Sequence, residues 1–249
     1  MAYKILAINP GSTSTKISLA NDDQPAFVAD IAHSREELSK FKRISDQYHF
    51  RKQVVIEELK KRNIPLDFDA VIGRGGLAKP VSSGVFTITK QMIIDQQRAI
   101  HQHACDLGCM IADEIARDIP NCKSFIADPG VVDEMEPEAR LSGSPLMPRM
   151  CIWHALNQKA IGRRFAKDMG TSYDKLNLII CHLGGGISIA AHSHGRAIDA
   201  NNALDGEGPF SPERAGTLPA ADLIHLCFSG NYTEEQFLKK VSGHAGLLS

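Results

Sequence analysis

The chain has 249 residues, of which 43% are hydrophobic and 23% charged, a composition typical of a soluble globular protein. Its formal net charge of -1 gives no electrostatic basis for binding nucleic acid or an anionic membrane, so neither is expected as a partner. No apolar stretch is long enough to span a bilayer, and six cysteines without paired or zinc-type spacing favour reduced thiols in a cytoplasmic protein.

The first half of the chain predicts strands that alternate with helices. Short apolar runs that end in polar turns predict strands at residues 4–8, 16–20, 25–31, 69–73 and 124–128. Ser34 followed by Glu37 is a capping-box pattern, which predicts helical structure that continues, with a break, to about residue 62. Further helices are expected at 89–99 and 106–119. The mixed charges of residues 41–61 indicate a solvated helix face.

The second half repeats the opening arrangement. Prolines interrupt residues 129–148 and predict irregular structure, so we expect a boundary near Arg149 and domains at 1–149 and 150–249. The patterns after this boundary predict a helix at 152–167 and strands at 177–182, 187–191 and 196–199. A strand, a glycine turn and a second strand therefore occur near the start of each half. This recurrence indicates an internal duplication of architecture.

Each glycine turn has a composition that suits phosphate. Residues 7–16 hold one glycine, four hydroxyl side chains and a lysine, and phosphate oxygens bind backbone N–H groups, hydroxyls and cations. Residues 184–186 are three glycines, which let backbone amides approach an anion without interference from β-carbons. A plain polar or flexible hairpin turn is an equally good interpretation of each. Neither turn is a Walker A loop, and no G-x-G-x-x-G dinucleotide fingerprint is present.

Four single residues are candidates for chemistry. Arg74 lies between glycines directly after a strand, where its guanidinium could hold a carboxylate or a phosphoryl group. Arg214 is open to the same interpretation, although a surface arginine is the simpler one for both. Asp128 ends a strand before a Pro-Gly pair, so it could orient a nucleophile or a hydrated metal, or mark a plain turn. His154, at a helix start, could donate to a transferring group or be an ordinary helix residue.

The ten histidines do not define a metal site by their spacing. His101 and His103, with two cysteines that follow, resemble a zinc set only loosely and fit no standard pattern. His192 and His194 would share one face of a strand, which makes them a conceivable ligand pair, but exposed strand histidines are more common.

Six segments in register resemble the acetate and butyrate kinase family, which belongs to the superfamily of sugar kinases, heat-shock proteins and actin. They are AINPGSTSTKI (7–17), GRGGL (73–77), ADPGVVDEMEPEARLSG (127–143), the helix around Trp153 and His154, HLGGGISIA (182–190) and DGEGPFSPERAGTLP (205–219). The Cys-Gly-Ser-Ser-Ser loop and the Phe-His-Gly-Thr helix start typical of acetate kinases are missing, so the resemblance is closest to butyrate kinases. A sugar kinase is disfavoured because GRGGL and PERAG match the carboxylate-binding pattern.

The resemblance implies an α/β fold of two duplicated actin-like (ribonuclease H-like) domains with mixed sheets. Family members continue beyond residue 249, so the second domain is expected to be incomplete and the fragment alone to bind ATP weakly and have little or no activity. A non-catalytic remnant that binds only phosphate or a partner is the alternative. The resemblance also implies ATP and Mg²⁺ as cofactors, a small carboxylic acid as substrate, and a homodimer.

The resemblance assigns roles to individual residues. Those assigned to ATP phosphate lie in the two glycine turns: Gly11, Ser12, Ser14, Lys16, His182, Gly184, Gly185 and Gly186. Those assigned to magnesium and to the acid are Asn9 for the ion, and Arg74 and His103 for the acid. The catalytic set is Asp128, His154 and Arg214. The implied reaction is direct in-line phosphoryl transfer, which depends on positioning and charge neutralisation. A carboxylate is already a competent nucleophile at neutral pH, so Asp128 is expected to orient groups or to support the metal.

Overall fold

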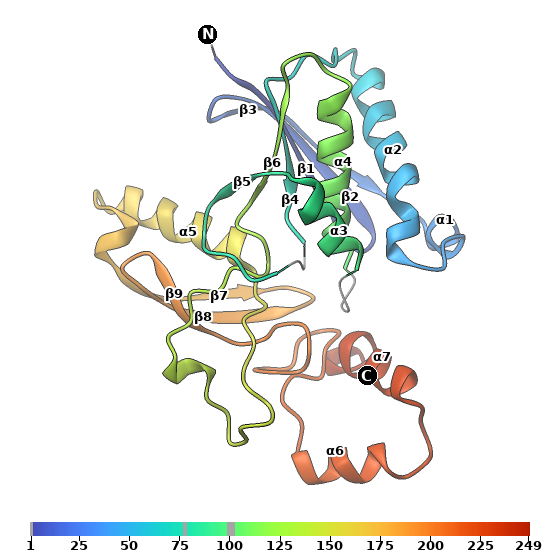
Figure 1. Cartoon of the computed structure of the whole chain (residues 1–249), viewed down its shortest axis with the longest axis vertical. Helices are drawn as coiled ribbons and strands as arrows, with labels where there is room; N and C mark the ends of the chain where they lie inside the picture. Colours follow the sequence, from blue (N-terminus) through green and yellow to red (C-terminus); the bar gives the residue numbers. More distant parts are fainter. Residues whose placement is uncertain (1, 77–78, 99–102) are drawn as a thin grey trace. The chain divides into compact units, whose positions relative to one another are not determined.

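The computed structural model describes residues 2–76, 79–98 and 103–249. The chain forms two compact units, Met1–Val131 and Val132–Ser249 (Figure 1). Across the described parts of both units, no helix has the length and apolar character needed to cross a membrane.

The segment before Arg149 belongs to the second unit. The sequence analysis expected a boundary near Arg149, whereas the contacts divide the chain before Val132. Two interactions explain the difference. The indole Nε1 of Trp153 donates to the carbonyl oxygen of Val132 at 2.7 Å, and the ammonium of Lys159 donates to Glu134 Oε2 at 2.6 Å.

A six-stranded mixed sheet forms the centre of the first unit, in the order β3-β2-β1-β4-β6-β5. Its strands are β1 (Lys4–Pro10), β2 (Ser14–Asn21), β3 (Gln24–Ala32), β4 (Ala70–Arg74), β5 (Val85–Thr87) and β6 (Lys123–Ala127). The first three are antiparallel, β4 and β6 run parallel to β1, and β5 pairs antiparallel with β6. The mixed sheet confirms the predicted α/β class. The short edge strand β5 is the one that the sequence analysis did not predict.

Two helices, α2 (Tyr48–Lys61) and α4 (Asp106–Arg117), cover one face of this sheet (Figure 1). The first unit also contains α1 (Arg35–Ser39), a 3-10 turn (Ile44–Gln47) and α3 (Lys90–Gln97). The predicted capping box is present at the start of α1, where the Ser34 hydroxyl and the Glu37 carboxylate each accept from the other residue's backbone N–H. Leu6 and Ile8 of β1 pack in one core with Val55 of α2. Alternation along β1 therefore turns the residues between them to the opposite face.

Two glycines allow α4 to lie directly on β4. A β-carbon on Gly73 would lie 2.1 Å from the carbonyl oxygen of Gly108, and one on Gly108 would lie 2.4 Å from the carbonyl oxygen of Arg74. Any larger residue at either position would separate the helix from the strand. This close packing fixes the end of β4, where Arg74 emerges.

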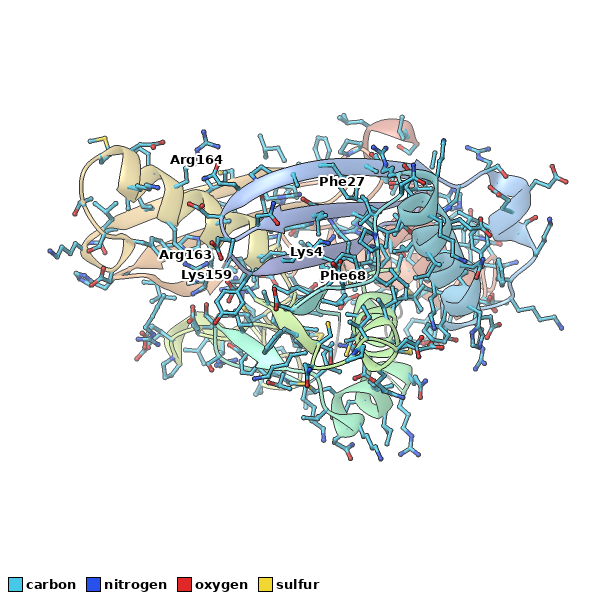
Figure 2. All side chains as sticks on the ribbon, turned by 90° about the horizontal axis from the view of Figure 1, so that it is seen from above. Lys4, Phe27, Phe68, Lys159, Arg163 and Arg164 are labelled. Atoms are coloured by element: carbon cyan, nitrogen blue, oxygen red, sulfur yellow. The ribbon has the colours of Figure 1, made fainter. Side chains whose placement is uncertain are left out.

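The second unit contains a three-stranded antiparallel sheet, in the order β7-β8-β9. Its elements are α5 (Ala155–Asp168), β7 (Asn177–Leu183), β8 (Ile187–Ser193), β9 (Arg196–Ala200), α6 (Ala220–Cys227) and α7 (Glu234–Gly243), with 3-10 turns at Glu138–Arg140, Tyr173–Lys175 and Gly246–Leu248. Helix α5 packs on β7. Along α5, Lys159 is buried, whereas Arg163 and Arg164 are exposed (Figure 2).

The predicted recurrence of a hairpin with a glycine turn is confirmed. Strands β1 and β2 pair antiparallel around the turn after Pro10, and β7 and β8 pair antiparallel around residues 184–186. Each hairpin supplies the first two strands, in chain order, of the sheet in its own unit. The two segments that the sequence assigned to phosphate are therefore both hairpin turns.

Candidate active site

A row of polar side chains crosses the exposed face of the first sheet. Asp30 on β3 is paired with Lys16 on β2, and Lys16 is paired with Asn9 on β1. Arg74, at the end of β4, continues the row, because its Nη1 donates to Asn9 Oδ1 at 3.4 Å. The Lys16 ammonium lies 3.3 Å from the Asp30 carboxylate. The structure thus brings together three residues that the sequence analysis singled out separately.

The first glycine turn leaves backbone donors for an anion. The N–H of Gly11 closes the turn by donating to the carbonyl oxygen of Ser14 at 2.7 Å. Among the residues that the structure describes, the N–H groups of Ser12 and Thr13 donate to no protein acceptor, and both residues are exposed. Two adjacent amides of this kind, beside Lys16, form a suitable site for phosphate oxygens.

Arg51 of α2 holds this turn from the interior. Its guanidinium is fully buried and donates to the carbonyl oxygens of Ser14 at 3.1 Å and Ser12 at 3.3 Å. It also donates to Thr15 Oγ1 at 3.1 Å and to Gln47 Oε1 at 3.0 Å. Burial lowers the pKa of Arg51 to about 10. Because these bonds draw the carbonyls inward, they fix the turn with its free N–H groups at the surface.

Arg51 was not predicted from the sequence. Residues 41–61 were interpreted as a solvated helix face, and this interpretation is wrong for one side of α2, where Arg51, Val55 and Leu59 are buried. Their spacing of four residues is the signal that could have revealed a buried face. An arginine on such a face needs acceptors, and the carbonyls of the turn supply them.

Asp128 follows β6, next to the strand end that carries Arg74. Parallel pairing places Arg74 opposite Ala127, so Asp128 continues the same edge of the sheet. Asp128 is buried, and its φ of 34° lies in the left-handed region, which is uncommon for a residue with a side chain. Its Oδ1 accepts from Ser83 Oγ at 2.6 Å and from the Gly84 N–H at 2.9 Å. These two bonds fix the orientation of the carboxylate.

His103 lies just before α4. Its backbone N–H donates to Asp106 Oδ2 at 2.7 Å, and its Nδ1 lies 3.1 Å from Cys105 Sγ. His103 belongs to the first unit, as does Arg74. The other histidine of the loose zinc pattern, His101, lies outside the described residues.

In the second unit, two predicted site histidines stack on each other. The rings of His154 and His182 are nearly parallel, at 6°, with centroids 3.7 Å apart. His154 precedes α5, and its Nδ1 lies 2.8 Å from Ser188 Oγ. His182 is on β7, and its Nδ1 lies 2.9 Å from Asn157 Nδ2. The start of α5 therefore lies over the hairpin that carries the second glycine turn.

Arg214 lies against this second turn. A β-carbon on Gly186 would be 2.2 Å from Arg214 Nη1, which in turn donates to the carbonyl oxygen of Ala203. Ser211 joins the two segments, because its buried hydroxyl donates to the carbonyl oxygen of Gly185 at 2.5 Å and accepts from the Arg214 N–H at 3.1 Å. No role was predicted for Ser211 from the sequence.

The predicted shared face of His192 and His194 is wrong. His192 is on β8 and is buried, whereas His194 follows the strand in a turn with φ of 48° and is exposed. A register shift after Ala191 also breaks the alternation on which the expectation rested. Within residues 2–76, 79–98 and 103–249, no group of three or more His, Cys, Asp or Glu could hold a metal ion.

The ligands near the first turn nevertheless fit magnesium. Asn9 offers an amide oxygen and Asp128 a carboxylate, and both are hard oxygen ligands at the ends of β1 and β6, which lie on either side of β4. Magnesium is commonly held by one or two carboxylates together with substrate phosphates and water, rather than by a protein cage. A donor set of this size is consistent with an ion that arrives with a nucleotide.

A mixed-sheet unit whose opening hairpin recurs in a second unit is the arrangement of the actin-like fold, and the arginines beside both turns suit a protein that binds phosphate. The crystal structure of Porphyromonas gingivalis acetate kinase shares the fold, with a TM-score of 0.73 and 17% identity over 99% of this chain and 69% of that one. The chain belongs to the acetokinase family, which matches residues 149–249, and it groups there with the butyrate kinases.

The similarity to butyrate kinases extends over nearly the whole chain. The probable butyrate kinase of Bacteroides thetaiotaomicron is 62% identical over 244 residues, which are 98% of this chain and 69% of that protein. Butyrate kinase 1 of Clostridium acetobutylicum is 49% identical over 249 residues, which are 99% of this chain and 70% of that protein.

Proposed function

We propose that this protein transfers the γ-phosphoryl group of ATP to the carboxylate of butyrate or a related short-chain acid. A carboxylate oxygen forms the new bond to phosphorus, the bond to the β-phosphate oxygen breaks, and ADP leaves, so that no proton is transferred. The placement of Arg74 beside Asn9, at the turn end of the first hairpin, carries the proposal. It puts a carboxylate-binding guanidinium next to a turn that suits phosphate.

The two glycine turns are proposed to bind ATP phosphate. In the first, the Ser12 and Thr13 amides and Lys16 supply donors and charge, and Arg51 holds the turn in shape. In the second, the absence of side chains at 184–186 allows close approach of the backbone. Preorganised donors of this kind act without reorganisation during the reaction.

The remaining predicted residues are proposed to act on the acid and on the moving phosphoryl group. Arg74, with His103, would bind the acid through charge-assisted hydrogen bonds. His154 and Arg214 would offset the charge that spreads over the phosphoryl oxygens. Asp128, fixed by Ser83 and Gly84, would orient groups, because an ionised acid substrate needs no base.

Magnesium is proposed to accompany ATP and would neutralise phosphate charge, and Asn9 and Asp128 would supply oxygen ligands to it. A small carboxylic acid is the proposed partner. The cytoplasmic location and the homodimer expected from the sequence stay predictions.

The test is formation of an acyl phosphate by the full-length protein. We expect ATP and butyrate to give butyryl phosphate, which hydroxylamine converts to a hydroxamate that can be measured. Arg74→Ala should raise the KM for butyrate at least about tenfold, because a hydrogen bond to a charged group contributes about 1.5–3 kcal/mol. Arg117→Ala, at an exposed arginine of α4, is the control and should leave the kinetics unchanged. ATP binding without any acyl phosphate would support the phosphate-binding remnant instead.

A further inference from the structure

A chain of side-chain hydrogen bonds leads from His154 into the interior of the second unit. Ser188 Oγ lies 2.8 Å from His154 Nδ1, and Gln158 Nε2 lies 2.9 Å from Ser188 Oγ. Gln158 Oε1 lies 2.9 Å from His192 Nε2, and His192 Nδ1 lies 2.5 Å from Tyr173 Oη. Ser188, Gln158 and His192, which lie in the middle of this series of hydrogen bonds, are almost completely buried. No part of the proposed reaction yet uses Ser188, Gln158, His192 or Tyr173.

One backbone carbonyl fixes the direction of these bonds. The amide nitrogen of Gln158 donates to the carbonyl oxygen of Ser188 at 3.0 Å. A carbonyl oxygen can only accept, so the nitrogen of the Gln158 amide must face Ser188 and its oxygen must face His192. Since that oxygen also only accepts, Nε2 of His192 must carry a proton.

The Ser188 hydroxyl then has only one way to orient. Its oxygen accepts from Gln158 Nε2 at 2.9 Å and from the backbone N–H of His154 at 3.2 Å. A hydroxyl has two acceptor positions and one proton, so with both acceptor positions used the proton points to His154 Nδ1. His154 Nδ1 is therefore an acceptor, and a neutral His154 ring carries its proton on Nε2.

The hydrogen bonds at the Tyr173 end of this series point in the same direction. Burial, and to a smaller extent the charge of Lys159, lower the pKa of His192 to about 4, so this ring is neutral near pH 7. With its proton on Nε2, His192 accepts at Nδ1, and the Tyr173 hydroxyl is the donor. Each group thus donates toward His154, and bonds aligned in this way polarise one another.

We propose that Gln158 and Ser188 are positioning residues that hold His154 in the tautomer with its proton on Nε2. The ring then presents a neutral hydrogen-bond donor to an oxygen of the transferring phosphoryl group. This inference rests on the proposed function for the role of His154, but the tautomer itself follows from the second unit alone. Stacking on His182 adds a constraint on the ring plane, because the two planes differ by only 6°.

The tautomer can be measured directly on the full-length protein labelled with ¹⁵N-histidine. At a pH where His154 is neutral, its resonances should show an unprotonated Nδ1 and a protonated Nε2. A spectrum with the proton on Nδ1 would overturn the proposal. Because the unmodified protein gives this result, the test does not require any variant to fold.

Ser188→Ala tests the cause. Without the donating hydroxyl, the His154 spectrum should shift toward a mixture of the two tautomers. The kcat of acyl phosphate formation should fall about tenfold with little change in either KM, a smaller loss than the roughly 10²–10³-fold typical of removing a direct transition-state donor. Ser193→Ala is the matched control, because its hydroxyl on the same strand donates to Asn177 instead. An unchanged tautomer and unchanged kcat in Ser188→Ala would overturn the proposal.

The two proposals can fail separately. If the protein forms no acyl phosphate but His154 has the expected tautomer, and Ser188→Ala alters it, the proposed function is wrong and the positioning role of Ser188 holds. If acyl phosphate forms but the proton is on Nδ1, the function holds and the positioning role is wrong.

Discussion

Gly186 and Arg214 are in such close contact that a β-carbon on the glycine would lie 2.2 Å from Nη1 of the arginine. The obstructing atom is the end of a flexible side chain, so Gly186→Ala should move the guanidinium rather than the backbone. If Arg214 offsets charge on the phosphoryl group, kcat should fall about 10²-fold, as for loss of a transition-state donor. Steady-state kinetics of the full-length protein, with a melting curve, would measure both effects.

The control for this variant is Gly143→Ala, where an added β-carbon meets no atom within 4 Å. It should leave kcat and melting temperature unchanged. Normal kcat in Gly186→Ala would mean that the observed position of the Arg214 guanidinium is not needed for the reaction.

Replacement of Arg51 should weaken ATP binding more than acid binding. Arg51→Met removes the donor to the Ser12 carbonyl and to the buried Gln47 Oε1 and leaves the Ser14 carbonyl with only the Gly11 N–H, and each buried acceptor left unsatisfied costs about 1–3 kcal/mol. The turn would then lose its fixed shape, and the KM for ATP should rise about tenfold or more while that for butyrate changes less. Arg51→Lys should recover only part of this loss, because one ammonium cannot reach all the acceptors of the guanidinium.

Lys60→Met is a suitable comparison for Arg51→Met, because Lys60 is exposed on the same helix. It should behave like the parent protein. Equal increases in both KM values, or none, would show that Arg51 does not act through the phosphate turn.

The hairpins were predictable because their pattern is local. Along β1 and β8, buried and exposed residues alternate, and glycines or small polar residues mark the turns. The strand β5 has only three residues, and a run of that length carries no readable alternation. Helices α6 and α7 were not predicted either, and their described residues bury no side chain that would impose a clear apolar face.

The candidate site was predictable where sequence motifs coincide with strand ends. Arg74 and Asp128 were identified in this way and Asn9 from the family resemblance, and parallel pairing of their strands places the three at one edge of the sheet. Arg51 and Ser211 were not identified, because their importance comes from carbonyls distant in sequence. An arginine on a helix or a serine in a loop is normally exposed. Arg51 has one local signal, its four-residue spacing from Val55 and Leu59, whereas nothing local distinguishes Ser211.

Loss of Lys159 should destabilise the second unit. Its ammonium lies 2.6 Å from Glu134 Oε2, and the side chains are only 1% and 12% exposed. Glu134 also accepts from the Ala197 N–H at 2.9 Å, so the pair ties the segment before α5 to β9. Lys159→Met leaves a largely buried carboxylate without its partner, which should cost about 3–5 kcal/mol of unfolding free energy. Urea denaturation would measure the loss.

A second substitution separates the ion pair from side-chain packing. Combining Lys159→Met with Glu134→Gln removes the uncompensated charge, so the double variant should be more stable than Lys159→Met alone. Arg164→Ala is the surface control, because its ion pair with Asp168 is exposed and 3.9 Å long. A double variant no more stable than Lys159→Met would show that lost packing, not buried charge, is responsible.

Acid should destabilise the protein through His192. Its pKa is about 4 in the folded state, against 6.5 for an unperturbed histidine, because burial disfavours the charged ring. Between these values the unfolded chain binds more protons, so stability is present above pH 6.5 and is lost as the pH falls toward 4. One pKa unit corresponds to about 1.4 kcal/mol, so His192 should account for a loss of up to about 3 kcal/mol. Urea denaturation at several pH values should give a steeper dependence for the parent protein than for His192→Gln, and equal slopes would show that His192 is not the group responsible.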